Sequence, residues 1–324
     1  MLIRKTHLSG DSIPSSQITP LEVFEDHRQR MPRRGFLAQS ATVAAGASLA
    51  GMLPNRAFAD DTKLETIPGK FQATDNQTPF SKATTYNNFY EFGTSKDEPA
   101  KNAHTLHTRP WTIEVDGLVK QKKTVNIDDL LHYRPLESRV YRHRCVEAWS
   151  MVIPWDGYSL SEFINFCEPL PSARYVQFTS KIDYKQMPDL PTGYNWPYTE
   201  GLRMDEAMHP LAMLTFGCYG QVLPNQNGAP VRVVLPWKWG YKSAKSIVKF
   251  HFTKDEPSTL WNQIEPSEYG FYSNVNPNSG HRIPQQRERR LDSGFPHTLP
   301  TQMFNGYGDL VAGLYTGMDL LRNY

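Results

Sequence analysis

Cys145 is the residue of this sequence whose chemistry is most evident. It lies in the segment RHRCVEAWS, residues 142–150, where Arg142, His143 and Arg144 precede it. A cysteine reacts, or binds a metal, as its thiolate, and nearby positive charge favours that ionised form. The segment therefore predicts an ionised thiol that either attacks a substrate or holds a metal, and the residue types do not choose between the two.

The first 59 residues have the pattern of an export signal. Arg33 and Arg34 are followed by an uncharged run, rich in Ala, Gly and Ser, that reaches Leu53, and residues 57–59 (AFA) offer a small-residue cleavage site. The paired arginines and the weakly apolar run favour the twin-arginine route. A membrane anchor is the alternative, but the run is marginal for a span of ~20 apolar residues. We expect residues 1–59 to be removed after export.

Export also changes the charge balance. The whole chain has 35 Lys and Arg against 33 Asp and Glu, and the predicted leader holds more basic than acidic residues. The remainder is therefore close to neutral. A nucleic-acid-binding protein needs a basic field, so we expect no nucleic-acid partner, and the basic clusters that exist must serve local sites.

Residues 60–324 are predicted to form a single domain, because their length suits one large core and no composition break or repeat divides them. Three cysteines allow at most one disulfide. Cys167 and Cys218 are predicted to be buried thiols, although a disulfide between them stays open. His104 and His107 lack neighbours that would complete a metal site, which predicts structural or surface roles.

Hydrophobic periodicity predicts a strand-rich chain with short helices. Runs of β-branched and aromatic residues bounded by Gly, Pro and Asn predict strands at residues 111–115, 124–127, 139–145, 173–180, 211–216, 231–235 and 245–253. Helical spacing predicts helices at 128–132, at 159–167 with Ser159 as the cap, and at 309–321 with Leu310, Leu314 and Met318 on one face. These elements predict an α+β fold of mixed β-sheets with peripheral helices.

Three further segments combine residue types that suit a polar ligand. Residues 86–92 (YNNFYEF) place an amide and a carboxylate among aromatics, and residues 227–232 (NGAPVR) place an amide and a guanidinium around a Gly-led turn. Residues 237–245 (WKWGYKSAK) interleave aromatics with lysines, as a loop near an anionic group would. Each segment also has a structural interpretation: a core strand, a turn leading into a strand, and a solvated turn, respectively.

Taken together, these segments resemble one enzyme family. CVEAWS at residues 145–150, followed by PWDG at 154–157, resembles the molybdenum-binding core of the sulfite oxidase family of molybdopterin enzymes. Within that family the chain is similar to the catalytic subunits of bacterial periplasmic protein-methionine-sulfoxide reductases. The strings that carry this likeness are TTYNNFYEFG at 84–93, NGAPVR at 227–232, EYGFYSNVNP at 268–277 and FNGY at 304–307. The resemblance implies a sulfite-oxidase-type molybdopterin-binding fold.

The resemblance also implies one molybdenum-molybdopterin cofactor per chain. Cys145 would be the protein's sulfur ligand to molybdenum and the catalytic residue, since molybdenum in a dithiolene is held by soft sulfur ligands. The pterin carries a phosphate and many hydrogen-bonding edges, which calls for amides, a guanidinium and backbone donors. By resemblance its ligands would be Asn87, Tyr90, Glu91, Ser180, Asn227, Arg232, Ser243, Ala244 and Lys245. Ser180 stands where the family carries Thr, and the hydroxyl is retained.

In this interpretation the basic residues before Cys145 form the electrostatic surround of an anionic cofactor. The implied reaction is transfer of the sulfoxide oxygen from methionine sulfoxide in oxidised periplasmic proteins to the molybdenum centre, with two electrons and two protons removing that oxygen as water. If the substrate is a residue of another protein, the site should open to the surface. We expect its rim to include aromatics such as Trp149, Trp155, Trp237 or Trp239.

The electrons must come from another protein, because the sequence has no haem or iron-sulfur ligand spacing. The resemblance implies a membrane-embedded haem b subunit, fed by quinol, in a heterodimer with this chain. Two other functions stay open. One is a sulfite-oxidising enzyme, in which Arg142 and Arg144 line a basic pocket for the dianion, or another molybdoenzyme that reduces small sulfoxides or N-oxides. The other is a cofactor-free exported binding protein in which Cys145 is a buried thiol.

Overall fold

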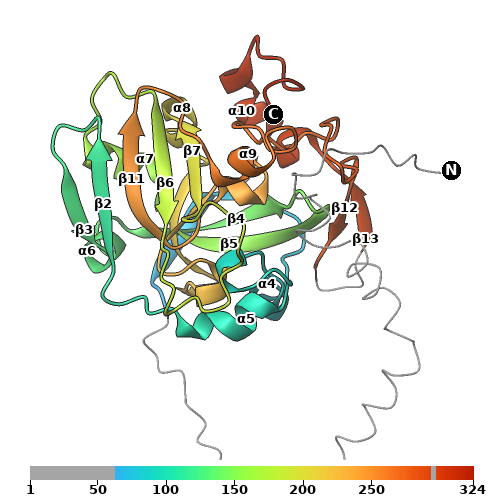
Figure 1. The fold of residues 1–324 in the computed structure, drawn as a ribbon. Helices are drawn as coiled ribbons and strands as arrows, with labels where there is room; N and C mark the ends of the chain where they lie inside the picture. Colours follow the sequence, from blue (N-terminus) through green and yellow to red (C-terminus); the bar gives the residue numbers. More distant parts are fainter. Residues whose placement is uncertain (1–62, 293–296) are drawn as a thin grey trace, which may run out of the picture. The chain divides into compact units, whose positions relative to one another are not determined.

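Two β-sheets carry the fold in the computed structural model, which describes residues 63–292 and 297–324 (Figure 1). The described residues belong to one unit whose parts contact each other throughout. The predicted leader, residues 1–59, lies outside the described residues. None of the helices within the described ranges is long and apolar enough to cross a membrane.

The larger sheet has the strand order β1-β4-β5-β12-β13, and β8 pairs with β5, β9 and β10. Its strands are β1 (Thr66–Gln72), β4 (Leu136–Arg144), β5 (Trp149–Ser159), β8 (Met213–Cys218), β9 (Gln221–Val222), β10 (Arg232–Val234), β12 (Arg287–Arg290) and β13 (His297–Pro300). The β4–β5 hairpin is antiparallel and ends with Arg144 opposite Ser150. The strand bounds leave residues 145–148, beginning with Cys145, for the connection between the two strands.

The smaller sheet has the order β3-β2-β11-β6-β7. Its strands are β2 (Thr112–Gly117), β3 (Lys123–Asn126), β6 (Tyr175–Ser180), β7 (Thr199–Arg203) and β11 (Ile247–Thr253). The central strand β11 is parallel to β2 and antiparallel to β6. Because β11 pairs Ile247 with Ser180, the end of β6 lies beside the chain that leads into β11. Two of the predicted ligand segments are thereby brought together.

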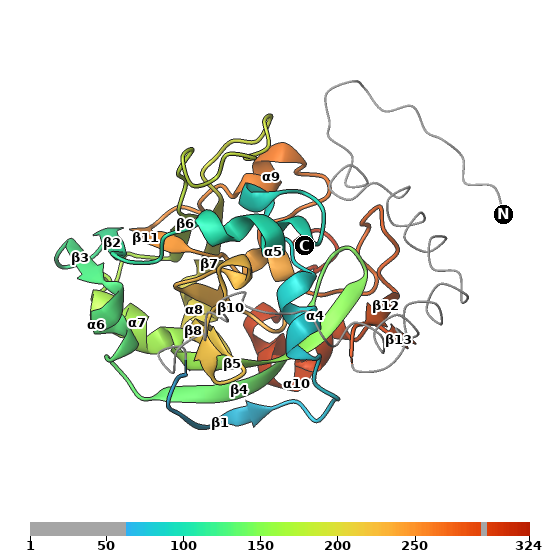
Figure 2. The ribbon, with the colours of Figure 1, turned by 90° about the horizontal axis from the view of Figure 1, so that it is seen from below.

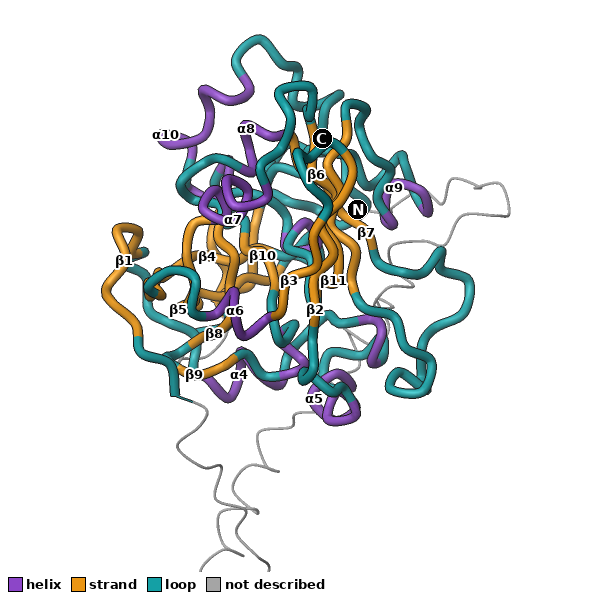
Figure 3. Tube along the Cα trace, turned by 90° about the vertical axis from the view of Figure 1, so that its left-hand side faces the viewer, coloured by secondary structure: helices purple, strands orange, loops and turns teal. Residues whose placement is uncertain are grey.

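The described helices are short and lie around the sheets (Figures 2 and 3). They are α4 (Phe80–Thr85), α5 (Glu98–Asn102), α6 (Ile127–Leu131), α7 (Leu160–Cys167), α8 (Met204–Ala207), α9 (Leu260–Ile264) and α10 (Gly308–Val311). Helix α7 buries one apolar face, made of Leu160, Phe163 and Ile164. Mixed sheets with peripheral helices confirm the predicted α+β class.

The predicted strands are found at β2, β3, β4, β6, β8, β10 and β11, and the first two predicted helices at α6 and α7. Strand β5 was not predicted. Its residues are buried from Trp149 to Tyr158, so no polar alternation marks it, and Pro154 and Gly157 interrupt the β-branched pattern. The cap of α7 also differs from the prediction. Ser159 precedes the helix, but its hydroxyl accepts a bond from Arg139 (2.8 Å) instead of capping a backbone amide.

The predicted C-terminal helix at 309–321 is wrong in length and in its buried face. The structure has α10, then a 3₁₀ helix (Ala312–Tyr315), and no regular helix in the described residues after that. Leu310 is 51% exposed, whereas Val311 and Tyr315 are buried. Gly313 weakens helical propensity, and Gly317 adopts φ +80°, which ends a right-handed helix.

Candidate active site

Cys145 begins the connection between β4 and β5. Its backbone N–H donates to the carbonyl of Trp149 (2.9 Å), and its own carbonyl accepts from Ala148 (3.1 Å), which closes a tight turn. Ala148 adopts φ +62°, a conformation that is unfavourable for a residue with a Cβ. The two long strands hold this turn in place, so the thiol is held on a rigid hairpin and is only 6% exposed.

A carboxylate stands beside the thiol. The backbone N–H of Glu147 (3.5 Å) and the Nδ2 of Asn88 (3.4 Å) lie within donating distance of Cys145 Sγ. The Glu147 carboxylate pairs with Lys96 (2.7 Å) and accepts from Trp149 Nε1 (3.1 Å) and Asn88 Nδ2 (3.1 Å). Glu147, Asn88 and Lys96 were not predicted as site residues, although Glu147 and Asn88 lie within strings that carry the family likeness.

The surroundings of the thiol are less basic than the sequence predicts. Burial and, to a smaller extent, the Glu147 carboxylate raise the pKa of Cys145 to about 12, and Lys96 and Arg144 only partly offset them. By itself the group is therefore a neutral thiol near pH 7. A bound metal ion would supply the positive charge that deprotonates a coordinating thiol, so this environment suits a metal ligand better than a free nucleophile.

Strand alternation explains why the basic neighbours of Cys145 do not surround it. Side chains along a strand point alternately to opposite faces. Arg142 pairs with Asp75 (2.8 Å), and Arg144 is fully buried against Glu288 (3.1 Å). Only His143 belongs to the other face, where the charges of Arg232 and Lys245 help burial to lower its pKa to about 3. Arg142 therefore lies away from the thiol, whereas Arg144, although paired with Glu288, donates to the Cys145 carbonyl and lowers the pKa of the thiol.

The two predicted amide ligands meet at one backbone carbonyl. Asn87 follows α4, and Asn227 precedes Gly228, whose φ of +101° turns the chain toward β10. The Nδ2 atoms of Asn87 (3.0 Å) and Asn227 (2.9 Å) both donate to the carbonyl of Ala83. Their Oδ1 atoms are buried and have no hydrogen-bond partner. Segments 140 residues apart in the sequence are thus brought together with free acceptors.

Arg232 connects this pair to the loop before β11. Its guanidinium donates to the carbonyls of Asn227 (2.8 Å) and Ser243 (3.3 Å) and lies over the ring of Trp155. The backbone of Ala244 bonds to Val233 N–H (3.1 Å) on β10. Asn227, Arg232 and Ser243 are therefore in direct contact inside the protein, and Ala244 lies beside β10.

Lys245 and Ser180 complete this group of residues. Lys245 places its Nζ 5.5 Å from the centroid of the Phe89 ring. Ser180, at the end of β6, pairs with Ile247, which follows Lys245 closely in the chain. The Ser180 hydroxyl is buried without a hydrogen-bond partner. Burial and the neighbouring positive charge of Arg232 together lower the pKa of Lys245 to about 7.

We call Asn87, Ser180, Asn227, Arg232 and Lys245 the polar cradle. Buried polar atoms are almost always hydrogen-bonded, so three unpartnered atoms in one place indicate a missing ligand. Among the described residues, neither Arg232 nor Lys245 forms an ion pair. Two adjacent buried cations with acceptors and a hydroxyl around them fit a ligand that has both an anionic group and hydrogen-bonding edges, as molybdopterin does.

The remaining predicted ligands, Tyr90 and Glu91, lie in a 3₁₀ helix (Tyr90–Phe92) and not in a core strand. The Tyr90 hydroxyl lies 3.5 Å from Glu147 Oε1. Burial raises the pKa of Glu91 to about 7, and the positive charge of Lys245 opposes that rise. Tyr90 therefore belongs to the Cys145 side of the site and Glu91 to the Lys245 side.

The predicted aromatic rim is wrong. Trp149, Trp155, Trp237 and Trp239 are 5%, 1%, 0% and 1% exposed, so they pack inside the protein and cannot contact a protein substrate from its surface. Trp149 instead donates to Glu147, and Trp155 lies under Arg232. Large aromatic side chains pack well in a protein core and also suit binding sites. Residue type alone does not separate these two roles.

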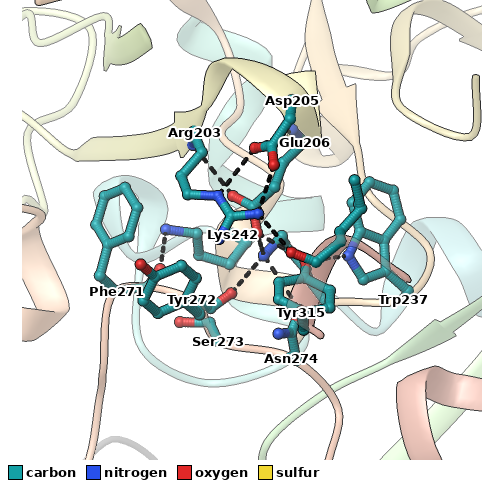
Figure 4. Close-up of polar contacts among 12 residues, drawn as sticks. Arg203, Asp205, Glu206, Trp237, Lys242, Phe271, Tyr272, Ser273, Asn274 and Tyr315 are labelled. Atoms are coloured by element: carbon teal, nitrogen blue, oxygen red, sulfur yellow. Dashed lines mark hydrogen bonds and ion pairs between the residues drawn. The ribbon is translucent and has the colours of Figure 1, made fainter. Parts of the chain in front are cut away.

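A buried ionic network supports the loop that carries Ser243 to Lys245. Lys238 Nζ donates to Glu206 Oε1 (2.6 Å), the Tyr272 carbonyl (2.6 Å) and Asn274 Oδ1 (3.1 Å). Tyr315 also donates to Glu206 Oε1 (2.7 Å). We call Glu206, Lys238, Asn274 and Tyr315, with the Tyr272 carbonyl, the Lys238 cluster; Figure 4 shows much of it.

A second buried pair continues this support one turn along the loop. Lys242 pairs with Glu200 (2.6 Å) and donates to the Phe271 carbonyl (2.7 Å). Both lysines of the WKWGYK string are therefore committed to structure, and the interpretation of this string as a solvated turn is wrong. Of the lysines in the segment 237–245, Lys245 is the one that reaches the polar cradle.

The other singled-out residues lie outside the site. Cys167 and Cys218 are buried and unpaired, as predicted for structural thiols. His104 Nδ1 contacts the Lys101 carbonyl (2.7 Å) at an exposed position. No group of three or more His, Cys, Asp and Glu side chains within residues 63–292 and 297–324 could hold a metal ion. A molybdenum centre needs no such group, because its pterin supplies most of the ligands.

Comparison with known proteins agrees with this geometry. Residues 100–261 match the family described as the oxidoreductase molybdopterin binding domain. The chain is 54% identical to the protein-methionine-sulfoxide reductase catalytic subunit MsrP of Ralstonia nicotianae, over 99% of both chains. It is 53% identical to MsrP of Burkholderia mallei over 100% of both, and 47% identical to MsrP of Gluconobacter oxydans over 90% of this chain and 95% of that one.

Among solved structures, the sulfane dehydrogenase SoxCD of Paracoccus pantotrophus matches with a TM-score of 0.41 and 15% identity, over 65% of this chain and 55% of that one. The matched family defines the class as a molybdopterin-binding oxidoreductase. More particularly, the identity over nearly the whole chain shows that the protein belongs to the family of MsrP, the catalytic subunits of protein-methionine-sulfoxide reductase.

Proposed function

We propose that the protein reduces methionine sulfoxide residues of other proteins to methionine at one molybdenum-molybdopterin cofactor per chain. The observation that carries this proposal is the polar cradle: three unpartnered buried atoms and two cations without ion pairs, beside a buried thiol. The names of the relatives supply the substrate. The cradle supports the cofactor independently of those names, because its free polar atoms need a partner.

Cys145 Sγ is the ligand that this chain would offer to molybdenum. The pterin would be held by Asn87, Tyr90, Glu91, Ser180, Asn227, Arg232, Ser243, Ala244 and Lys245. Bound there, the molybdenum centre supplies two-electron oxygen-atom chemistry. Arg232 and Lys245 would neutralise the phosphate of the cofactor, and the Oδ1 atoms of Asn87 and Asn227 would accept from its hydrogen-bonding edges.

The chain's other task is to orient the thiol and keep water from it. Asn88 Nδ2 and the Glu147 N–H donate toward Sγ, and the Glu147 carboxylate holds the Asn88 amide in place. Although burial raises the pKa of Glu147, Lys96 lowers it to about 2, so the carboxylate stays ionised and keeps its donors aligned. A sulfoxide that reaches this site loses its oxygen as water when two electrons and two protons are added, and leaves as a thioether.

The structure makes the sulfite-oxidising alternative less favourable. That reaction needs a basic pocket for a dianion, and the two arginines expected to form it are paired with Asp75 and Glu288 on the opposite face of β4. A sulfoxide is neutral and needs no such pocket. The distribution of charge around Cys145 therefore supports a neutral substrate.

We propose that the electrons come from a membrane-embedded haem b subunit that is fed by quinol, and that the protein works in the periplasm after twin-arginine export. The sequence supports both, through the Arg33-Arg34 pair and the lack of haem or iron-sulfur ligand spacing. Replacing Arg33 and Arg34 by lysine and fractionating the cells would test the export route. Quinol oxidation by membranes that hold the haem subunit, with and without this chain, would test the partner.

The direct test uses a reduced dye as electron donor and an oxidised protein as substrate. We expect the wild type to hold molybdenum and to convert protein-bound methionine sulfoxide to methionine, measured by mass spectrometry. Cys145→Ala should lose this activity, because the metal loses its protein ligand, while Cys167→Ala should keep it as a matched buried-thiol control. A molybdenum-free wild type from a cofactor-producing host, or faster turnover of sulfite than of sulfoxide, would contradict the proposal.

A further inference from the structure

The connection between β6 and β7, residues 181–198, carries the aromatic side chains of Tyr194 and Trp196 at the protein surface. It projects beside α9, as Figure 2 shows. Tyr194 and Trp196 are both partly exposed, and their rings lie 5.4 Å apart. Trp196 Nε1 donates to the Pro191 carbonyl (2.8 Å), and Asn195 contacts Gln263 of α9 (3.4 Å). The two rings are therefore held in a defined position, although their segment has no regular secondary structure.

A series of ring contacts leads from these two side chains inward, toward the Cys145 thiol. The Tyr194 ring lies 6.2 Å from that of Tyr90 and 5.9 Å from that of Trp261, and Tyr90 and Trp261 are 5.4 Å apart. The Tyr90 hydroxyl lies 3.5 Å from Glu147, whose backbone N–H donates to Cys145 Sγ. We call Trp196, Tyr194, Trp261 and Tyr90 the aromatic row. It joins the surface to the reacting sulfur of the site.

Exposure changes along the row. Tyr90 and Trp261 are 7% and 5% exposed, as core residues are, whereas Tyr194 and Trp196 keep part of their rings in contact with water. The inner pair is satisfied by packing. The outer pair presents rigid apolar area next to the site, which is the kind of area that binds a partner at low entropic cost.

The chemistry of the substrate matches this arrangement. The side chain of methionine sulfoxide has a polar S–O bond, which must reach the metal, and a methyl and two methylene groups, which are apolar. Sulfur-containing and aliphatic groups contact aromatic rings favourably. A polypeptide that delivers this side chain to Cys145 must also place its flanking residues on the surface beside the site, and the outer rings are the large apolar groups there.

We propose that Tyr194 and Trp196 recognise the polypeptide that flanks a methionine sulfoxide, and that they determine the preference for protein-bound over small sulfoxides. This rests on the proposed function. An electron-donating subunit is the other partner that could cover these rings. The substrate is favoured because the reacting atoms must approach to ~3–3.5 Å, so the surface joined to the thiol must stay open to it.

The test compares two substrates under dye-driven turnover, with the molybdenum-loaded enzyme. The first is a chemically oxidised, unfolded casein and the second is dimethyl sulfoxide, which has no flanking residues. Loss of an anchoring aromatic side chain commonly weakens a protein contact about tenfold or more. For Tyr194→Ala/Trp196→Ala we therefore expect KM for the oxidised casein to rise about tenfold, with kcat and both constants for dimethyl sulfoxide within about twofold of wild type.

Tyr184→Ala is the matched control, since Tyr184 lies in the same connection, is 73% exposed and makes no ring contact with the aromatic row. An equal rise in KM in this variant would overturn the assignment. So would an unchanged KM for casein in the double variant, or an equal loss for both substrates. A defect confined to quinol-driven turnover would assign the rings to the electron donor instead. If the wild type reduces neither substrate, the proposed function fails and not this inference alone.

Discussion

The Lys238 cluster and the polar cradle contain the same kinds of residue but differ in how their polar atoms are satisfied. All three protons of the Lys238 ammonium have acceptors, and Glu206 Oε1 has two donors. In the cradle, the Oδ1 atoms of Asn87 and Asn227 and the hydroxyl of Ser180 have none. Burial is therefore similar in the two regions, and what distinguishes the ligand site from the structural network is unsatisfied hydrogen-bonding capacity together with unpaired charge.

The difference has an energetic meaning. A buried ion pair with complete hydrogen bonding is stable in the protein as it stands, and it fails when one partner is removed. The unpartnered atoms of the cradle destabilise the protein while no ligand is bound. Hydrogen bonds to a ligand remove this cost and thereby strengthen ligand binding. Asn274 Nδ2 and Glu200 Oε1 also lack partners, but the cations beside them, Lys238 and Lys242, are both ion-paired.

The largest expected effect is on the Lys238 cluster. Lys238→Met leaves the Glu206 carboxylate buried without its cation, and breaking a buried pair in this way costs about 3–5 kcal/mol of stability. Denaturant unfolding of the apoprotein measures it. Lys238→Met/Glu206→Gln should recover a large part of the loss, because no charge is left uncompensated. Equal losses in the single and double variants would show that the cluster contributes packing and not charge pairing.

The next effect is in the cradle. Arg232→Met removes a cation that has no carboxylate partner but that donates to the carbonyls of Asn227 and Ser243, so the apoprotein should lose about 1.5–3 kcal/mol, less than Lys238→Met. Cofactor binding should weaken by about 10–100-fold, since hydrogen bonds to charged groups contribute ~1.5–3 kcal/mol. Molybdenum content measures the effect on cofactor binding, and denaturant unfolding of the apoprotein measures the effect on stability. A stability loss as large as that of Lys238→Met would remove the distinction between the regions.

A smaller effect is expected from two serines of the site. Ser180→Ala removes a hydroxyl without a partner, so apoprotein stability should stay within about 0.5 kcal/mol of wild type, which is typical of substitutions that break no contact. Ser243→Ala removes an acceptor of the Leu235 N–H (3.2 Å) and should cost about 1 kcal/mol. Ser180→Ala should lower cofactor retention without lowering apoprotein stability, whereas Ser180→Thr should lower neither. A Ser180→Ala variant that loses apoprotein stability but keeps its cofactor would contradict the assignment of Ser180 to the cradle.

The smallest effect is anion binding by the apoprotein. Lys245 has a pKa of about 7, so it is protonated at pH 6 and neutral at pH 9, and an anion should bind better at the lower pH. Sulfate keeps its charge over this range, and at several times its Kd it should add about 1 kcal/mol to the free energy of unfolding. Lys245→Met controls for the general effect of sulfate on stability. A sulfate effect of equal size in wild type and variant would place the anion elsewhere.

The sequence alone predicted much of the fold, because alternation along β2, β6 and β11 and the apolar face of α7 are local patterns. It failed where local patterns are absent or misleading. Strand β5 is buried over nearly its whole length, and the C-terminal segment has helical spacing that Gly313 and Gly317 interrupt. Strand pairing between distant segments, such as β11 with β2, is set by packing of the whole domain.

For the site, the sequence determined the chemistry: one thiol, amides, a guanidinium and lysines in strings that resemble one enzyme family. Only the tertiary structure decided which of them act together. Alternation along β4 directs Arg142 and Arg144 away from the face of His143, and the turn brings Glu147 to the thiol. Which donors and acceptors remain free after folding depends on contacts between segments far apart in the chain, so no local pattern reveals the polar cradle.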